Sequence, residues 1–292
     1  MLIAIIVGTS KTGEAKMALL SNEVEPEKKR PAGKNLGKTA FVVGLIVILV
    51  SVYAQYVIPN LNLISGTLLV YGLPILVTGV IWGRTIIAKA LRHMYTAVRY
   101  GLGYFGIFTV IGLAVSILIL IVLTLLDPSA INLLHKPNPV LQVSPELARF
   151  MVGFSFLVVG PSEEYLFRGF VFGGLLNVLK GRHWLFLAFV SSLFFAGVHL
   201  YYAVVYGVAS LVQFADLITF GMAMAATYYA SGGNLLVPAM IHGAYDATGY
   251  VGVATSSQIG VQLREVMIVI GLIAAFIVFS RRKRNAPADE SG

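Results

Sequence analysis

Residues 104–126 have the sequence YFGIFTVIGLAVSILILIVLTLL, which contains no charged side chain. A helix rises about 1.5 Å per residue, so a stretch of this length crosses the roughly 30 Å hydrocarbon core of a bilayer. Similar apolar stretches lie near residues 40–58, 62–83, 147–177, 184–204, 207–230, 234–253 and 262–280. They lack the polar–apolar alternation of barrel strands, and only helices and closed barrels satisfy backbone polar groups in lipid. We therefore predict an all-α, polytopic membrane helical bundle of about eight transmembrane helices.

The overall composition agrees with a membrane protein. Of the 292 residues, 58% are hydrophobic and only 12% are charged, and the mean hydropathy is +0.85. These values leave no room for a separate soluble domain. We expect a cytoplasmic N-terminal segment over residues 1–38, a single transmembrane domain over 39–281, and a basic, disordered tail over 282–292. Because the chain has no cysteine, disulfides, a thiol nucleophile and cysteine-based metal sites are excluded.

Basic residues set the expected orientation. If the N-terminus is cytoplasmic and the chain crosses eight times, seventeen of the 21 lysines and arginines lie on the inner side. The positive-inside rule then places both termini in the cytoplasm, and the protein in the cell membrane if its source is prokaryotic. We attribute the net charge of +8 to contact with anionic membrane lipid and expect no nucleic acid partner. Residues 84–100 mix apolar and basic side chains, which suits an amphipathic surface helix or a plain linker.

Glu163, Glu164 and Arg168 form the first of three polar motifs inside apolar stretches. A charged side chain at bilayer depth costs about 2.5 to 3.5 kcal/mol on insertion scales, so its presence needs a reason such as catalysis. Glu164 and Arg168 stand one helical turn apart and can pair. Glu163 points about 100° away and is expected to be unpaired, free to act as a general base toward water. Pro161 should kink the helix or start a new one just before the glutamates.

Two histidine motifs follow. His199 comes one turn after Phe195, and His242 comes one turn before Asp246, so each pair should share a helix face. His242 and Asp246 could face a common cavity and donate hydrogen bonds to a developing oxyanion. Together with Glu163 and His199, they could instead hold a divalent metal such as zinc.

Structural interpretations of the same residues stay open. The two glutamates could serve structure or lie in a polar vestibule, a lone buried histidine is usually structural, and His242 and Asp246 could simply bond each other. Asp216, in the sixth apolar stretch, is a further acid that we place in the cavity wall. The chain has no His-Glu-x-x-His zinc motif and no Gly-x-Ser-x-Gly elbow, so competing protease mechanisms lack their residues.

Taken together, the three motifs resemble those of the CAAX prenyl protease and bacteriocin-processing family, also called the CPBP or Abi family. The family pattern is Glu-Glu-x-x-x-Arg, then Phe-x-x-x-His, then His-x-x-x-Asn/Asp, and this chain matches all three in order. The approach to the last motif, from Gly232 to His242, is also similar, so the resemblance covers roughly residues 150–250. It implies an intramembrane protease with its active-site cavity inside the helical bundle.

The resemblance also implies roles for the motif residues. Glu163 would activate water with help from His199. His242 and Asp246 would form the oxyanion site. Glu164, paired with Arg168, would support the first motif. In the type II CAAX prenyl endopeptidases of this family, the last three residues of a prenylated protein are removed at the cytoplasmic face. A peptide or prenylated protein is therefore the expected substrate. Family members are commonly labelled metalloproteases, which keeps zinc as a candidate cofactor.

The chain departs from the family pattern at one position, and two other functions are open to it. Position 246 is Asp where the CAAX endopeptidases tend to have Asn, and an ionised Asp would repel an oxyanion unless a proton or a metal intervened. A noncatalytic bacteriocin-immunity protein or scaffold of the same fold is the alternative function. A proton-coupled transporter would be expected to show repeated halves, and no repeat is visible.

Overall fold

The computed structural model describes residues 34–129, 132, 136 and 138–280. Nearly all of them belong to one compact unit, Lys38–Gly292, which is distinct from Met1–Gly37. Within the described part the secondary structure is helical and no strand occurs, so the all-α prediction is confirmed. The predicted N-terminal segment 1–38 falls almost entirely outside the described residues, and the predicted tail 282–292 falls wholly outside them.

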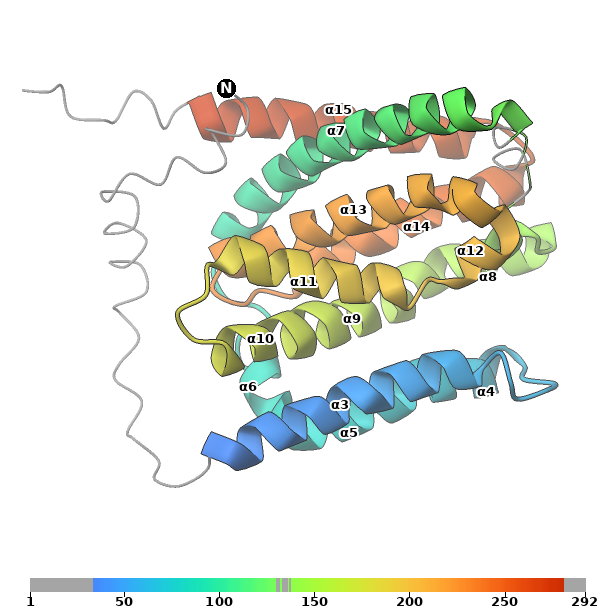
Figure 1. Ribbon diagram of the computed structural model, residues 1–292. Helices are drawn as coiled ribbons and strands as arrows, with labels where there is room; N and C mark the ends of the chain where they lie inside the picture. Colours follow the sequence, from blue (N-terminus) through green and yellow to red (C-terminus); the bar gives the residue numbers. More distant parts are fainter. Residues whose placement is uncertain (1–33, 130–131, 133–135, 137, 281–292) are drawn as a thin grey trace, which may run out of the picture. The chain divides into compact units, whose positions relative to one another are not determined.

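The described residues form eight main helical segments, whose arrangement is drawn in Figure 1. They are α3 (Lys34–Ala54), Leu63–Ile87, α7 (Met94–Leu126), residues 145–178, α11 (Trp184–Gly197), α13 (Ser210–Ala230), α14 (Leu236–Thr255) and α15 (Ile259–Ser280). We call Leu63–Ile87 the second helix and residues 145–178 the glutamate helix. A short helix, α12 (Tyr201–Tyr206), and a 3₁₀ turn, Gly207–Ala209, lead into α13.

Two of these segments contain π-helical turns. The second helix consists of α4 (Leu63–Thr67), α5 (Leu73–Thr78) and α6 (Arg84–Ile87), joined by π-helical Leu68–Gly72 and Gly79–Gly83. The glutamate helix consists of α8 (Pro145–Phe154), α9 (Gly160–Glu163) and α10 (Gly173–Val178), joined by π-helical Ser155–Val159 and Glu164–Phe172. Such wide turns are uncommon and occur frequently at functional sites.

Five helices of the described part are long and apolar enough to cross a bilayer. They are Gly37–Ala54, Leu63–Ile87, Met94–Leu126, Tyr201–Ala230 and Ile259–Ser280. The predicted spans 147–177, 184–204 and 234–253 do not meet these criteria. They are the three that carry the motifs, and α11 is also too short, with 14 residues. A polytopic helical bundle is therefore confirmed, although length and composition alone do not identify eight spans.

The structure corrects two predicted segments. Residues 84–100 do not form an amphipathic surface helix, because α6 ends at Ile87 and α7 already begins at Met94, ten residues before the predicted span. The predicted fifth span, 184–204, ends early at Gly197. There His199 Nδ1–H donates to the Phe195 carbonyl at 2.8 Å, while the His199 backbone N–H donates to the carbonyl of Ala196. A side chain that occupies the i−4 carbonyl competes with the helical bond, so the helix stops.

Pro161 does not start a new helix. The glutamate helix continues through it, with Pro161 in the first turn of α9 and π-helical turns on both sides. The N–H of Gly160 bonds the carbonyl of Ser155, five residues back. A proline ring collides with the carbonyl four residues earlier in a regular α-helix, so a wider turn before it accommodates the ring.

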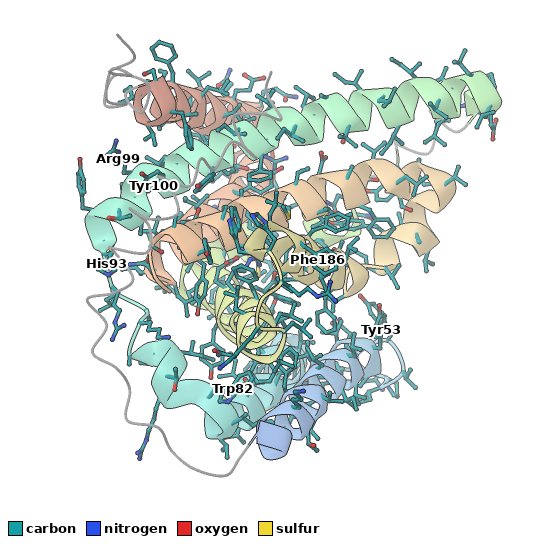
Figure 2. The ribbon with its side chains drawn as sticks, turned by 60° about the vertical axis from the view of Figure 1, so that its left-hand side comes forward. Tyr53, Trp82, His93, Arg99, Tyr100 and Phe186 are labelled. Carbon is teal, nitrogen blue, oxygen red and sulfur yellow. The ribbon has the colours of Figure 1, made fainter. Side chains whose placement is uncertain are left out.

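Packing brings the motif helices together. α14 lies against α8, α9 and the π-helical turn between them, and α11 and α7 both pack on α13. Figure 2 labels Trp82 of the second helix. On the other side of the glutamate helix, its ring stacks on Phe41 of α3, with ring centroids 5.7 Å apart, and lies 5.3 Å from Phe170. The first two helices are thus joined to the glutamate helix by an aromatic cluster.

Candidate active site

The three motifs meet between the glutamate helix, α14 and the end of α11. Glu163 is the last residue of α9, Glu164 begins the π-helical turn after it, and His199 lies just beyond α11. Most of the charged groups are buried, with Glu164 fully inaccessible and Glu163 and His242 below 10% exposure. Asp246 is about one-third exposed, so the cluster has one partly open side.

The predicted ion pair of the first motif is present. Arg168 Nη1 lies 3.0 Å from Glu164 Oε1, and both side chains are buried. The guanidinium also sits over the ring of Phe195, 4.6 Å from its centroid. A buried carboxylate and guanidinium stabilise one another only if both stay in place. The ion pair with Arg168 therefore holds the buried side chain of Glu164 in place.

Glu164 also holds His242. The Nδ1 atom of His242 lies 2.7 Å from Glu164 Oε1. An ionised carboxylate can only accept, so Nδ1 is the donor in this bond. The bond orients the ring so that Nε2 points away from Glu164. Nε2 then lies 3.5 Å from Glu163 Oε2 and 3.5 Å from Asp246 Oδ2. One imidazole thus joins all three carboxylates of the motifs.

The structure corrects the expectation that Glu163 is unpaired. Its Oε1 atom accepts a hydrogen bond from the hydroxyl of Tyr71 at 2.8 Å. Tyr71 belongs to the second helix, 92 residues away in sequence, and no motif singles it out. The only sequence signal was a hydroxyl-bearing side chain in an apolar span, and the chain has 14 tyrosines. Sequence reasoning therefore missed this residue.

His199 reaches the same place through Phe195. The two side chains share a face as predicted, with ring centroids 4.9 Å apart, and His242 meets the same phenyl ring edge-on at 5.9 Å. The Nδ1 atom of His199 is engaged by the Phe195 carbonyl, which leaves Nε2 for another partner. Asp216, which we predicted in the cavity wall, lies where α13 meets α7 and accepts a hydrogen bond from Ser116 at 2.9 Å.

Two glycines allow α14 to approach the glutamate helix. A Cβ atom on Gly160 would lie 2.5 Å from the carbonyl oxygen of Ala239, and one on Gly243 would lie 2.8 Å from Phe156 Cα and from Ser155 O. No side chain fits at such distances, so the backbones touch directly. Since Gly243 follows His242 and Gly160 precedes Glu163 by three residues, this contact sets the distance between the two motifs.

The motif residues include side chains of the types that bind metals. The candidate ligands are Glu163, His199, His242 and Asp246. Throughout the described residues, however, no group of three or more His, Asp or Glu side chains is spaced to hold a metal ion. In this structure the four side chains are therefore not spaced as metal ligands. Metal dependence stays a prediction.

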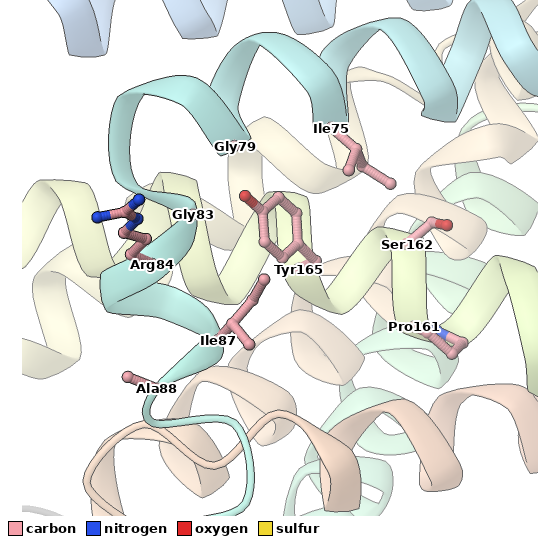
Figure 3. Close-up of a pocket in the computed structure, with 9 residues that line it drawn as sticks. All are labelled: Ile75, Gly79, Gly83, Arg84, Ile87, Ala88, Pro161, Ser162 and Tyr165. Atoms are coloured by element: carbon pink, nitrogen blue, oxygen red, sulfur yellow. The ribbon is translucent and has the colours of Figure 1, made fainter.

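A groove of about 720 Å³ lies beside the cluster, between the second helix and the glutamate helix. Figure 3 shows the ring of Tyr165 directed at Gly79 and Gly83, with Ser162 on the same side. Its walls are mainly apolar, and Arg84 supplies the one charged side chain. None of the six motif residues lines it, so the groove neighbours the site without containing it.

The segment that carries the motifs matches a known protein family. Residues 145–248 match the family described as Type II CAAX prenyl endopeptidase Rce1-like. The match begins at the first residue of α8 and ends within α14, and it includes all six motif residues but not Tyr71. No curated protein and no solved structure matches the chain.

Proposed function

We propose that this protein hydrolyses peptide bonds with Glu163 as general base, a function supported by the match of residues 145–248 to the Type II CAAX prenyl endopeptidase Rce1-like family. The observation that carries the proposal is the position of His242 Nε2, 3.5 Å from both Glu163 Oε2 and Asp246 Oδ2. A base and a hydrogen-bond donor then flank one small volume, as acyl transfer by activated water requires.

The reaction follows from these positions. Glu163 Oε2 takes a proton from water as the water oxygen attacks the peptide carbonyl carbon. The carbonyl electron pair moves to its oxygen, and this oxyanion accepts a hydrogen bond from Nε2–H of the His242 imidazolium, with Asp246 beside it. Both ring nitrogens of a histidine donate only when the ring is protonated. Glu163 then returns the proton to the amide nitrogen as the carbon–nitrogen bond breaks. An amine and a carboxylic acid leave, and the base is regenerated.

Glu164, Arg168 and His199 act in supporting roles. Glu164 accepts from His242 Nδ1–H, which keeps Nε2 on the side of the reacting carbonyl, and Arg168 compensates the buried charge of Glu164. His199, held by the Phe195 carbonyl, would present Nε2 to the attacking water. An orienting carboxylate behind a catalytic imidazole is a recurrent arrangement in hydrolases.

Asp246 offers a direct test of the oxyanion site. A carboxylate beside an oxyanion helps only if it carries a proton, whereas an amide of the same shape donates in any case. We expect Asp246→Asn to retain activity and Asp246→Ala to lose most of it, measured as kcat on one peptide. Loss of activity in Asp246→Asn would contradict the donor role and show that the carboxylate itself is required.

The proposed substrate is a prenylated CAAX protein whose C-terminal tripeptide is removed at the cytoplasmic face. The test uses the purified full-length chain in lipid vesicles with a farnesylated CAAX peptide, and mass spectrometry identifies the released tripeptide. Glu163→Gln keeps the shape of the side chain but not its basicity, so cleavage should fall by about 10²- to 10⁴-fold. Glu146→Gln, an exposed position on the same helix, is the matched control.

The outcomes separate the alternatives. Cleavage by wild type and Glu146→Gln alone supports the proposed base and substrate. Equal cleavage by Glu163→Gln would refute the base. If only an unprenylated peptide is cleaved, the protein is an endopeptidase of another substrate class. If neither peptide is cleaved, the noncatalytic immunity or scaffold function becomes the better account.

A further inference from the structure

We propose that Tyr71 is a positioning residue for Glu163, supplied by a helix outside the family-matched segment. The phenol holds one carboxylate oxygen so that the other is presented to water. This inference rests on the proposed role of Glu163 as general base. It adds to the three motifs a fourth component that lies at residue 71, far upstream of residues 145–248.

The contact with Tyr71 gives the two carboxylate oxygens of Glu163 different partners. Tyr71 Oη donates to Glu163 Oε1 at 2.8 Å, whereas Oε2 faces His242 Nε2 at 3.5 Å. The side chain of Glu163 is 10% exposed, so water competes little for the bonded oxygen. A carboxylate with one oxygen held by a directed donor cannot rotate freely about its terminal bond. Oε2 is therefore the oxygen that takes the proton.

A π-helical turn sets the position of Tyr71. In Leu68–Gly72 the N–H of Leu73 bonds the carbonyl of Leu68, five residues back, and Pro74 follows directly. The wider turn accommodates Pro74, which would otherwise collide with the carbonyl of residue 70. Because a π-turn rotates the residues before it relative to those after it, it also determines which face of the second helix carries Tyr71.

The second helix is anchored well away from Tyr71. Its Trp82 packs on Phe170 of the glutamate helix at 5.3 Å, and the Tyr165 hydroxyl lies close over Gly79 and Gly83. The phenol therefore stands on an element that is already held against the glutamate helix by other contacts. A group on a rigid element positions its partner more accurately than a group on a loop.

The first test compares Tyr71→Phe with Tyr100→Phe. Tyr100 is half-buried like Tyr71 and stacks on Tyr104 at 6.0 Å, at the start of α7 and outside the site. Loss of the Tyr71 hydroxyl frees the carboxylate to turn, and misplacement of a catalytic group by about 1 Å costs up to about 10²-fold. We expect kcat to fall about 10- to 100-fold with KM within twofold. Thermal unfolding should match that of Tyr100→Phe.

The second test does not depend on hydrolysis. Infrared difference spectra between wild type and Tyr71→Phe should contain a carboxylate stretching band, because the phenol bonds Glu163. When both proteins carry Glu163→Gln, that band should vanish, whereas a band from any other carboxylate would persist. If no substrate is cleaved, the proposed function fails, and this spectrum still decides whether Tyr71 holds Glu163.

Two results would overturn the inference. One is a Tyr71→Phe variant whose kcat equals that of Tyr100→Phe. The other is a difference spectrum with no Glu163-dependent carboxylate band. A fall in kcat accompanied by an equal rise in KM would also count against it, since Tyr71 touches Glu163 and not the substrate in the proposed mechanism.

Discussion

Replacing Gly243 by alanine should lower the activity of the site by pushing α14 away from the glutamate helix. The new Cβ would lie 2.8 Å from Phe156 Cα and from Ser155 O, about 0.6 Å short of the 3.4 Å at which ordinary van der Waals contact begins. Both obstacles are backbone atoms, which cannot turn aside as a flexible side chain would. The two helices must therefore separate locally by roughly this amount.

The separation acts directly on His242, the residue before Gly243. A shift of this size lengthens the bond from His242 Nδ1 to Glu164 Oε1 from 2.7 Å to about 3.3 Å, beyond the roughly 2.7–2.9 Å of a charge-assisted bond. Since misplacement by about 1 Å costs up to about 10²-fold, we expect kcat to fall at least about tenfold. Overpacking should also cost about 1 to 3 kcal/mol of stability.

A matched variant separates these two effects. A Cβ on Gly271 of α15 would lie 2.9 Å from Gly106 Cα of α7, so Gly271→Ala overpacks another helix pair to the same degree. The assay is cleavage of the CAAX peptide in lipid, together with thermal unfolding of both variants. We expect similar unfolding temperatures and near-wild-type kcat for Gly271→Ala only. Equal kcat in the two variants would refute the argument that the Gly243 contact sets the site geometry.

Three further predictions concern stability and topology. Arg168→Met should strand the buried carboxylate of Glu164 and cost about 3 to 5 kcal/mol in thermal unfolding, whereas Arg149→Met, in an exposed pair, should cost almost nothing. Asn234 is fully buried and bonds both the start of α14 and the turn before α7, so Asn234→Ala should lower stability by about 1 to 3 kcal/mol in the same assay. Because the chain has no cysteine, Ser257→Cys provides a single label site between α14 and α15. An impermeant maleimide should reach it from outside the cell, and labelling only after permeabilisation would reverse the predicted orientation.

Local spacing made part of the site predictable. Glu164 and Arg168 stand four residues apart on one helical segment, and their predicted pairing is observed at 3.0 Å. His242 and Asp246 have the same spacing and do face each other, at 3.5 Å. Interactions of this kind depend only on helix geometry, which the sequence specifies once the helix itself is recognised.

Helix boundaries were less predictable where a few side chains decide them. The end of α11 at Gly197 depends on a hydrogen bond that the ring of His199 donates to the backbone carbonyl of Phe195. Hydropathy carries no information about such a bond, so the predicted span ran on to residue 204. The predicted surface helix over residues 84–100 failed for a related reason, since the turn between Ile87 and Met94 interrupts an otherwise helical pattern.

The sequence by itself determined that this protein is a helical membrane bundle, and it identified the six polar residues whose burial needs an explanation. The tertiary structure alone decided how they are connected. The bonds from Glu164 to His242 and from Tyr71 to Glu163 join residues 78 and 92 positions apart. No local spacing encodes such contacts, because they exist only where glycine contacts and aromatic packing bring separate helices to a particular distance and rotation.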